Sequence, residues 1–84
     1  MNEIQWSRKA LKQLRKLAPQ DGKVVFAGAG ELSRFPECKN VKQLRNHQYG
    51  FRLRVGRHRV LFDYDGDVKI ISIEEVKKRD ENTY

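Results

Sequence analysis

The sequence has little that could cross-link the chain or anchor it in a membrane. Its 84 residues include a single cysteine, Cys38, so neither an internal disulfide nor a cysteine-based zinc cluster can form. No apolar run approaches the roughly 18 residues that span a bilayer, and the N-terminus lacks the apolar core of a signal peptide. We therefore expect one domain over residues 1–84, located in the cytoplasm, with no membrane, metal or cofactor involved in its function.

Negative charge is missing from a long central stretch. Between Cys38 and Phe62 there is no acidic residue, and the basic residues there are Lys39, Lys42, Arg45, Arg52, Arg54, Arg57 and Arg59. Over the whole chain, Lys plus Arg exceed Asp plus Glu by 18 − 11 = 7. A solubilising surface would mix the two signs. Charge separated in this way indicates a polyanionic partner, with nucleic acid the first candidate and an acidic protein segment the second.

Two helices are predicted in the first half of the chain, after a short strand at residues 2–6. Ser7 is a good N-cap, and apolar residues at helical spacing follow it up to Pro19, which we expect to end the first helix. Residues 20–35 favour a second helix, although each interior glycine costs about 1 kcal/mol relative to alanine. We expect these small residues to let the second helix pack closely against the first.

Three strands are predicted in the second half. Phe51, Leu53 and Val55 alternate with arginines, which is typical of a strand with one buried face. Gly56 marks a turn into a returning strand, and Asp65-Gly66 marks the next turn into a last strand, VKIISI at 68–73. The expected class is α+β in the order β-α-α-β-β-β, an antiparallel sheet with two helices packed on one face. Arg52, Arg54, Arg59 and, by extension, Arg57 would then line the bare face.

Three segments give the chain a resemblance to the RelE/ParE toxin superfamily. They are SRKALKQLRKL after the short strand, VKQLRNHQYGFRLRVGRHRVLFDY, and the ending VKKRDENTY. The resemblance implies the small RelE-like fold and a toxin of a bacterial type II toxin–antitoxin pair, neutralised by a cognate antitoxin and reaching operator DNA only through it. RelE-like members cut mRNA in the ribosomal A site, whereas ParE-like members poison DNA gyrase.

The resemblance also implies site residues for an endoribonuclease. Arg54 and Arg59 match basic hairpin positions that stabilise the charge on the phosphate, and Lys78 or Arg79 would act near the leaving oxygen. Tyr84 matches the closing tyrosine, which could stack on a base. Four further cations are expected to bind RNA phosphates, namely Lys42, Arg45, Arg52 and Arg57.

The general base is left open by the sequence. Ribosome-dependent members often carry lysines where this chain has Arg52 and Arg54, and a guanidinium hardly gives up its proton. His47, just before the hairpin, is the candidate base, while alternation aims His58 at the core. The leading interpretation is a ribosome-dependent, metal-free endoribonuclease. The alternatives are a gyrase inhibitor and a non-catalytic homologue that binds the antitoxin.

Overall fold

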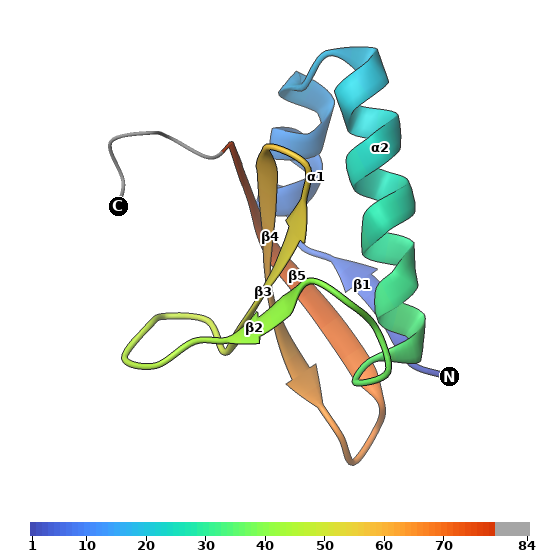
Figure 1. Ribbon diagram of the computed structural model, residues 1–84, viewed down its shortest axis with the longest axis vertical. Coiled ribbons are helices and arrows are strands. Elements are labelled where there is room, and N and C mark those ends of the chain that lie inside the picture. The colour runs from blue at the N-terminus through green and yellow to red at the C-terminus, as the bar shows by residue number, and fades with distance from the viewer. Residues whose placement is uncertain (79–84) are drawn as a thin grey trace.

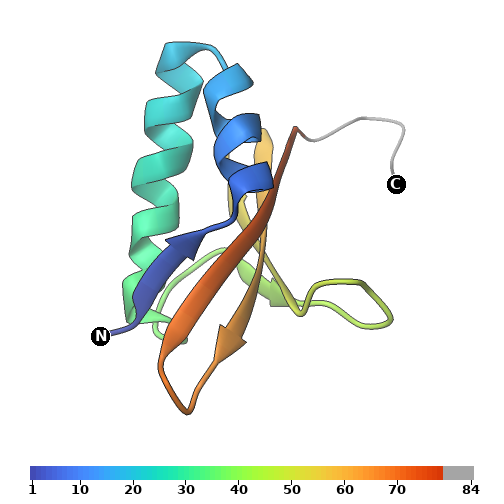
Figure 2. The ribbon, with the colours of Figure 1, turned by 180° about the vertical axis from the view of Figure 1, so that it is seen from behind.

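The computed structural model describes residues 1–78 and shows two helices packed on one face of a five-stranded sheet (Figure 1). In chain order the elements are β1 (Glu3–Trp6), α1 (Arg8–Lys16), α2 (Pro19–Gly30), the 3₁₀ helix η1 (Glu31–Arg34), β2 (Val41–Gln43), β3 (Phe51–Val55), β4 (His58–Asp65) and β5 (Ile70–Lys78). This confirms the predicted α+β class. It also leaves the second face of the sheet without a helix (Figure 2).

Local signals at the ends of the helices explain where they begin. The Ser7 hydroxyl accepts a hydrogen bond from the Ala10 backbone N–H at 3.0 Å, which caps α1 as expected. Pro19 not only prevents α1 from continuing but is the first residue of α2, a position that tolerates proline because its missing N–H has no partner there in any case. The chain therefore folds into a tight helical hairpin.

The sheet is mixed, which corrects the expectation of a wholly antiparallel one. Its strand order is β1-β5-β4-β3-β2, and β1 pairs with β5 in parallel while the other pairs are antiparallel. The helical hairpin carries the chain across the sheet, so that β1 and β2 occupy opposite edges. The predicted order also lacked β2, because a strand of three residues is too short to show an alternating pattern.

The last strand is longer than predicted. It begins at Ile70 and continues to Lys78, whereas Val68, expected within it, lies in the preceding turn and is 61% exposed. The sequence pattern concealed this extension because an irregularity in the pairing of β4 with β5 at Leu61/Phe62 breaks the alternation of buried residues. Beyond the irregularity, Val76 is again buried on the core side of the sheet, where it lies opposite Val60.

The core lies between the helices and the sheet, and α2 approaches β3 closely. A Cβ atom built on Gly28 would lie 2.8 Å from Cγ2 of Val55, which is closer than real carbon atoms pack. We had expected the small residues of the second helix to allow a close approach to the first helix. At Gly28, the close approach is instead to strand β3. The fully buried side chains at this interface include Val25, Leu32 and Val60.

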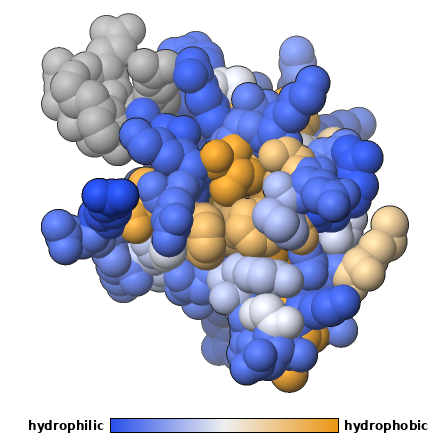
Figure 3. Space-filling view, turned by 60° about the horizontal axis from the view of Figure 1, so that its bottom comes forward, coloured by the Kyte–Doolittle hydropathy of each residue, from blue (hydrophilic) through white to orange (hydrophobic). Residues whose placement is uncertain are grey.

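Part of the apolar interior reaches the surface. Viewed from the lower end of Figure 1, apolar residues form a central patch bordered by hydrophilic ones (Figure 3). Partly buried hydrophobic side chains such as Phe51 and Tyr64 pack around the core, as expected for a domain of this size. Within residues 1–78, no helix has the length and apolar character needed to cross a membrane.

Candidate functional site

The β3–β4 hairpin places arginines on the face of the sheet that the helices leave bare. Leu53 and Val60 are buried on the helix side, so the residues that alternate with them, Arg52, Arg54 and Arg59, point the other way. Arg54 pairs directly with Arg59 across the two strands. The turn between the strands contains Gly56 at φ 57°, a left-handed conformation that glycine adopts readily. Arg57 lies in the same turn and is exposed.

A third cation continues this pair onto the neighbouring strand. Arg59 is in register with Lys77 of β5, so Arg54, Arg59 and Lys77 form one row across three strands, which we call the cation row. Adjacent strands lie about 4.8 Å apart, so the row extends over roughly 10 Å. Three positive charges at this spacing suit an anion with several oxygens, such as a phosphodiester in a nucleic acid.

Lys78, which with Arg79 is one of the two residues that the resemblance implies near the leaving oxygen, is in register with His58 instead. His58 is 7% exposed and belongs to the helix side of the sheet, so alternation places Lys78 on the face opposite the cation row. Sequence reasoning missed Lys77. The available signal was Val76, an apolar residue that alternates with Glu75 and Lys77 and therefore assigns both of them to the bare face.

The surroundings of the cation row strengthen its attraction for anions. Leu61 lies on the same face, opposite Arg52, and is only 5% exposed. The Nε atoms of Arg52 and Arg59 are also buried. Charges next to a buried apolar side chain are less screened by water than charges on an open surface. The nearby acid, Glu75, lies 3.8 Å from Lys77 Nζ and 3.3 Å from Lys9 Nζ, so two lysines share its one negative charge.

The other predicted phosphate-binding residues lie at the edge of the bare face. Lys42 of β2 is exposed and pairs with Arg52, which adds a cation next to the row. Arg45 lies in the loop between β2 and β3, and it is also exposed. That loop projects away from the helices, at the end of β3 farthest from the Gly56 turn (Figure 1).

His47 lies in the same loop and is exposed. Its Nδ1 accepts a hydrogen bond from the backbone N–H of Tyr49 at 3.1 Å, which leaves Nε2 as the ring atom available for proton transfer. The loop is held at its end by Gly50, whose N–H donates to Asp63 Oδ1 at 2.7 Å. Gly50 and Arg54 are about 13 Å apart along the strand at ~3.3 Å per residue, so the structure does not bring His47 to the cation row.

Two residues of the predicted site, Arg79 and Tyr84, lie outside the described residues. The site as described therefore consists of Arg54, Arg59 and Lys77, flanked by Arg52 and Lys42. Within residues 1–78, no three His, Cys, Asp or Glu side chains are grouped as metal ligands would be.

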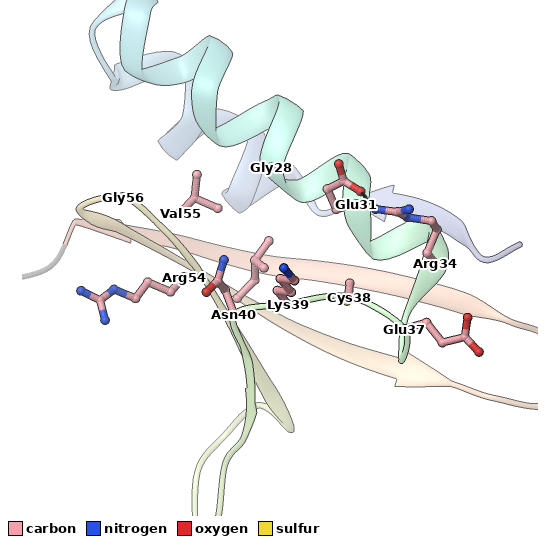
Figure 4. A pocket seen from close by; sticks show the side chains of 11 residues that line it. Gly28, Glu31, Arg34, Glu37, Cys38, Lys39, Asn40, Arg54, Val55 and Gly56 are labelled. Carbon is pink, nitrogen blue, oxygen red and sulfur yellow. Dashed lines mark hydrogen bonds and ion pairs between the residues drawn. The ribbon is translucent and has the colours of Figure 1, made fainter.

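A separate groove of about 650 Å³ opens between α2, η1 and the end of β3 (Figure 4). Gly28 and Val55 contribute apolar surface to its lining, which also includes the charged residues Glu31 and Arg34. Cys38 lines it as well. Burial raises the pKa of the Cys38 thiol, an effect that nearby Arg34 partly opposes. The thiol is therefore held protonated, which argues against a nucleophilic role.

Comparisons with known proteins agree on one group of toxins. The family model described as "ParE toxin of type II toxin-antitoxin system, parDE" matches residues 4–83. The solved RelBE2 toxin–antitoxin complex from Mycobacterium tuberculosis contains a chain that is 30% identical over 93% of this chain and 98% of its own length, with a TM-score of 0.80. The comparison with curated proteins gave no match.

More distant solved structures share the fold. The RelE–RelB complex from Pyrococcus horikoshii is 21% identical, covers 95% of this chain and 97% of its own, and has a TM-score of 0.78. The isolated RelE toxin of Escherichia coli is 15% identical over 99% of this chain and 89% of its own, with a TM-score of 0.79. With a family model matched along almost its whole length, and with these shared folds, the chain belongs to the RelE/ParE superfamily of type II toxins.

Proposed function

We propose that the protein is a ribosome-dependent endoribonuclease toxin that cuts translated mRNA. One observation carries the proposal, namely the direct pairing of Arg54 with Arg59 and the continuation of that pair to Lys77. Like charges placed opposite each other on a sheet destabilise it. A bound anion would offset this repulsion, and RNA is the anion that the resemblance to RelE-like toxins implies.

The proposed reaction is a transfer within the RNA itself. The ribose 2′-oxygen attacks the adjacent phosphorus while the bond from phosphorus to the 5′-oxygen breaks, which leaves a 2′,3′-cyclic phosphate and a 5′-hydroxyl. Arg54 and Arg59 would hold the phosphate oxygens and stabilise the extra negative charge of the transition state. Lys77 would donate a proton to the departing 5′-oxygen, because an ammonium can give up a proton that a guanidinium retains.

His47 is the candidate that residues 1–78 offer for the base that removes the 2′-hydroxyl proton. A general base must come within hydrogen-bond reach of that proton, so this role requires the loop between β2 and β3 to fold over the bound RNA. The His47→Gln variant decides the matter. If it cuts mRNA at the wild-type rate, His47 is not the base.

The main experiment is to induce the protein without its antitoxin and to map the 5′ ends of cellular mRNA while growth is followed. New ends in phase with the reading frame would support the proposal. Uncut mRNA would contradict it.

A second function, inhibition of DNA gyrase, is favoured by the family model, which describes ParE toxins. It predicts DNA damage and induction of the repair response while mRNA stays intact. The same induction experiment therefore separates the two functions. A folded protein that causes neither effect would instead be a non-catalytic homologue.

We further propose that a cognate antitoxin covers part of α2. Several of the similar structures are toxin–antitoxin complexes, and α2 presents unusually apolar side chains to solvent. Val24 and Phe26 are 56% and 57% exposed, and the Phe26 ring stacks on Trp6 of β1 with centroids 5.7 Å apart. The stacked rings of Phe26 and Trp6 form an apolar cluster at the surface, and such clusters typically mark an interaction surface. The protein's net charge of +7 would suit an antitoxin with an acidic segment.

A further inference from the structure

We infer that α1 carries a second binding surface for the RNA backbone. This surface adjoins the proposed cleavage site but takes no part in the cleavage. The surface consists of Lys9, Lys12 and Lys16, which we call the α1 stripe. The inference rests on the proposed function in one respect, since it takes RNA as the partner, but it concerns residues that touch no reacting atom.

The stripe is one face of the helix. Residues three and four apart lie on the same side of an α-helix, and this spacing aligns the three lysines with Gln13 between them. A shallow groove of about 440 Å³ runs along this face, lined by Arg8, Lys9, Lys12, Gln13 and Lys16. Lys12 and Lys16 are both exposed, so their ammonium groups are available to a large ligand.

Two contacts fix the stripe next to the cation row. The side chain of Gln13 accepts a hydrogen bond from the Val76 backbone N–H at 2.6 Å, so α1 lies along the free edge of the end of β5. In addition, Lys9 and Lys77 both contact the same oxygen, Glu75 Oε1. Lys77 thus belongs to the cation row and at the same time adjoins the α1 stripe. A single basic belt results, which runs from Arg54 across the sheet and onto α1.

The charge on the stripe is not neutralised within the described part of the protein. No acidic residue occurs between Ser7 and Gln20. Among residues 1–78, Lys9 alone of the α1 cations forms an ion pair, the one with Glu75. Like charges three or four residues apart destabilise a helix slightly. A polyanion bound along the belt would remove that repulsion.

RNA fits the stripe better than an acidic protein segment does. Protein interfaces depend on a few buried apolar or aromatic anchors, and the exposed large hydrophobic residues of the described chain are Met1, Val24, Phe26 and Val68, none of which lies on α1. Lysines attract phosphates as mobile point charges without reading the bases. The stripe should therefore bind structured RNA regardless of its sequence, which would hold the toxin in place while the cation row acts on the mRNA.

The test is to measure the binding of a short RNA duplex with methylated 2′-hydroxyls, which cannot be cut, to the full-length protein over a range of salt concentrations. Neutralising both lysines, as Lys12→Gln with Lys16→Gln, should make the slope of log K against log salt less steep by about 2, or about 1 for each lost phosphate contact. The matched control is Lys23→Gln, which removes an exposed lysine from α2 and should leave the slope unchanged.

Each outcome is decisive. An unchanged slope in the double variant overturns the inference, as does a change of about 1 in the Lys23→Gln control, because each lost charge would then count equally wherever it lies. Loss of binding to an acidic antitoxin peptide with RNA binding intact would also overturn it and assign the stripe to a protein partner. If the stripe binds the duplex as expected but induction of the wild-type protein leaves mRNA intact, the inference stands and the nuclease function fails.

Discussion

Arg54 and Arg59 lie directly opposite each other across β3 and β4, so their Cβ atoms are about 5 Å apart. Two permanent positive charges in these positions repel each other. Directly opposed like charges disfavour the sheet, and under the proposed function a bound phosphate would offset this repulsion. The effect of this pair on stability can be measured separately from its effect on activity.

Replacing Arg54 with alanine should therefore abolish toxicity without harming the fold. Loss of one group that stabilises the transition state typically lowers kcat by about 10²–10³. The free energy of unfolding should stay the same or rise by about 0.2–1 kcal/mol, because a repulsive pair is removed. Growth after induction and urea denaturation test the two effects. The control is Arg34→Ala, an exposed arginine outside the row that pairs with Glu31. An Arg54→Ala protein that folds normally and still arrests growth would refute the site.

The two neighbouring lysines at the end of β5 should differ sharply. Lys77 is in register with Arg59, and Lys78 with His58 on the opposite face. We expect Lys77→Met to lower mRNA cleavage by about 10²-fold, the lower range for loss of a general acid, and Lys78→Met to leave it nearly unchanged. The two variants remove the same charge one residue apart, so each controls for the other. The reverse order of effects would show that the β5 register does not set the site.

Some of this arrangement could be predicted from sequence, and the limits have physical causes. Alternation along 51–59 correctly assigned Arg52, Arg54 and Arg59 to the bare face, because one face of that hairpin is consistently apolar. The same reasoning failed in β5, where the irregularity opposite Leu61/Phe62 shifts the pattern. Pairing between strands distant in sequence, such as β1 with β5, leaves no local signal. The place of His47 is a further limit, because it lies in a loop whose course no alternating pattern predicts.

Cys38 should react slowly with thiol reagents. Burial raises the pKa of its thiol, so a smaller fraction is thiolate at any pH below that pKa, and the thiolate is the reactive form. We expect alkylation at pH 8 to be slower in the folded protein than in urea, with the folded rate still rising at higher pH. The rate for the urea-unfolded chain at the same pH is the control. Equal rates in the two states would mean that the thiol is not protected in the groove.

The contact between α2 and β3 predicts opposite effects at two nearby glycines. A Cβ on Gly28 would meet Val55 Cγ2 at 2.8 Å and Cγ1 at 3.0 Å, whereas a Cβ on Gly30 would have no neighbour within 4 Å. Gly28→Ala should therefore cost about 1–3 kcal/mol through overpacking. Gly30→Ala should stabilise the protein by about 0.4–1 kcal/mol, because alanine restricts the unfolded chain.

Urea denaturation of both variants measures these changes, and the combination of Gly28→Ala with Val55→Ala supplies the control. Removing the Val55 methyl groups should make room for the new Cβ, so the double variant should lose less stability than the sum of the two single changes. A strictly additive result would show that the two residues do not compete for the same space, and hence that Gly28 is not what allows α2 to lie close to the hairpin that carries the cation row.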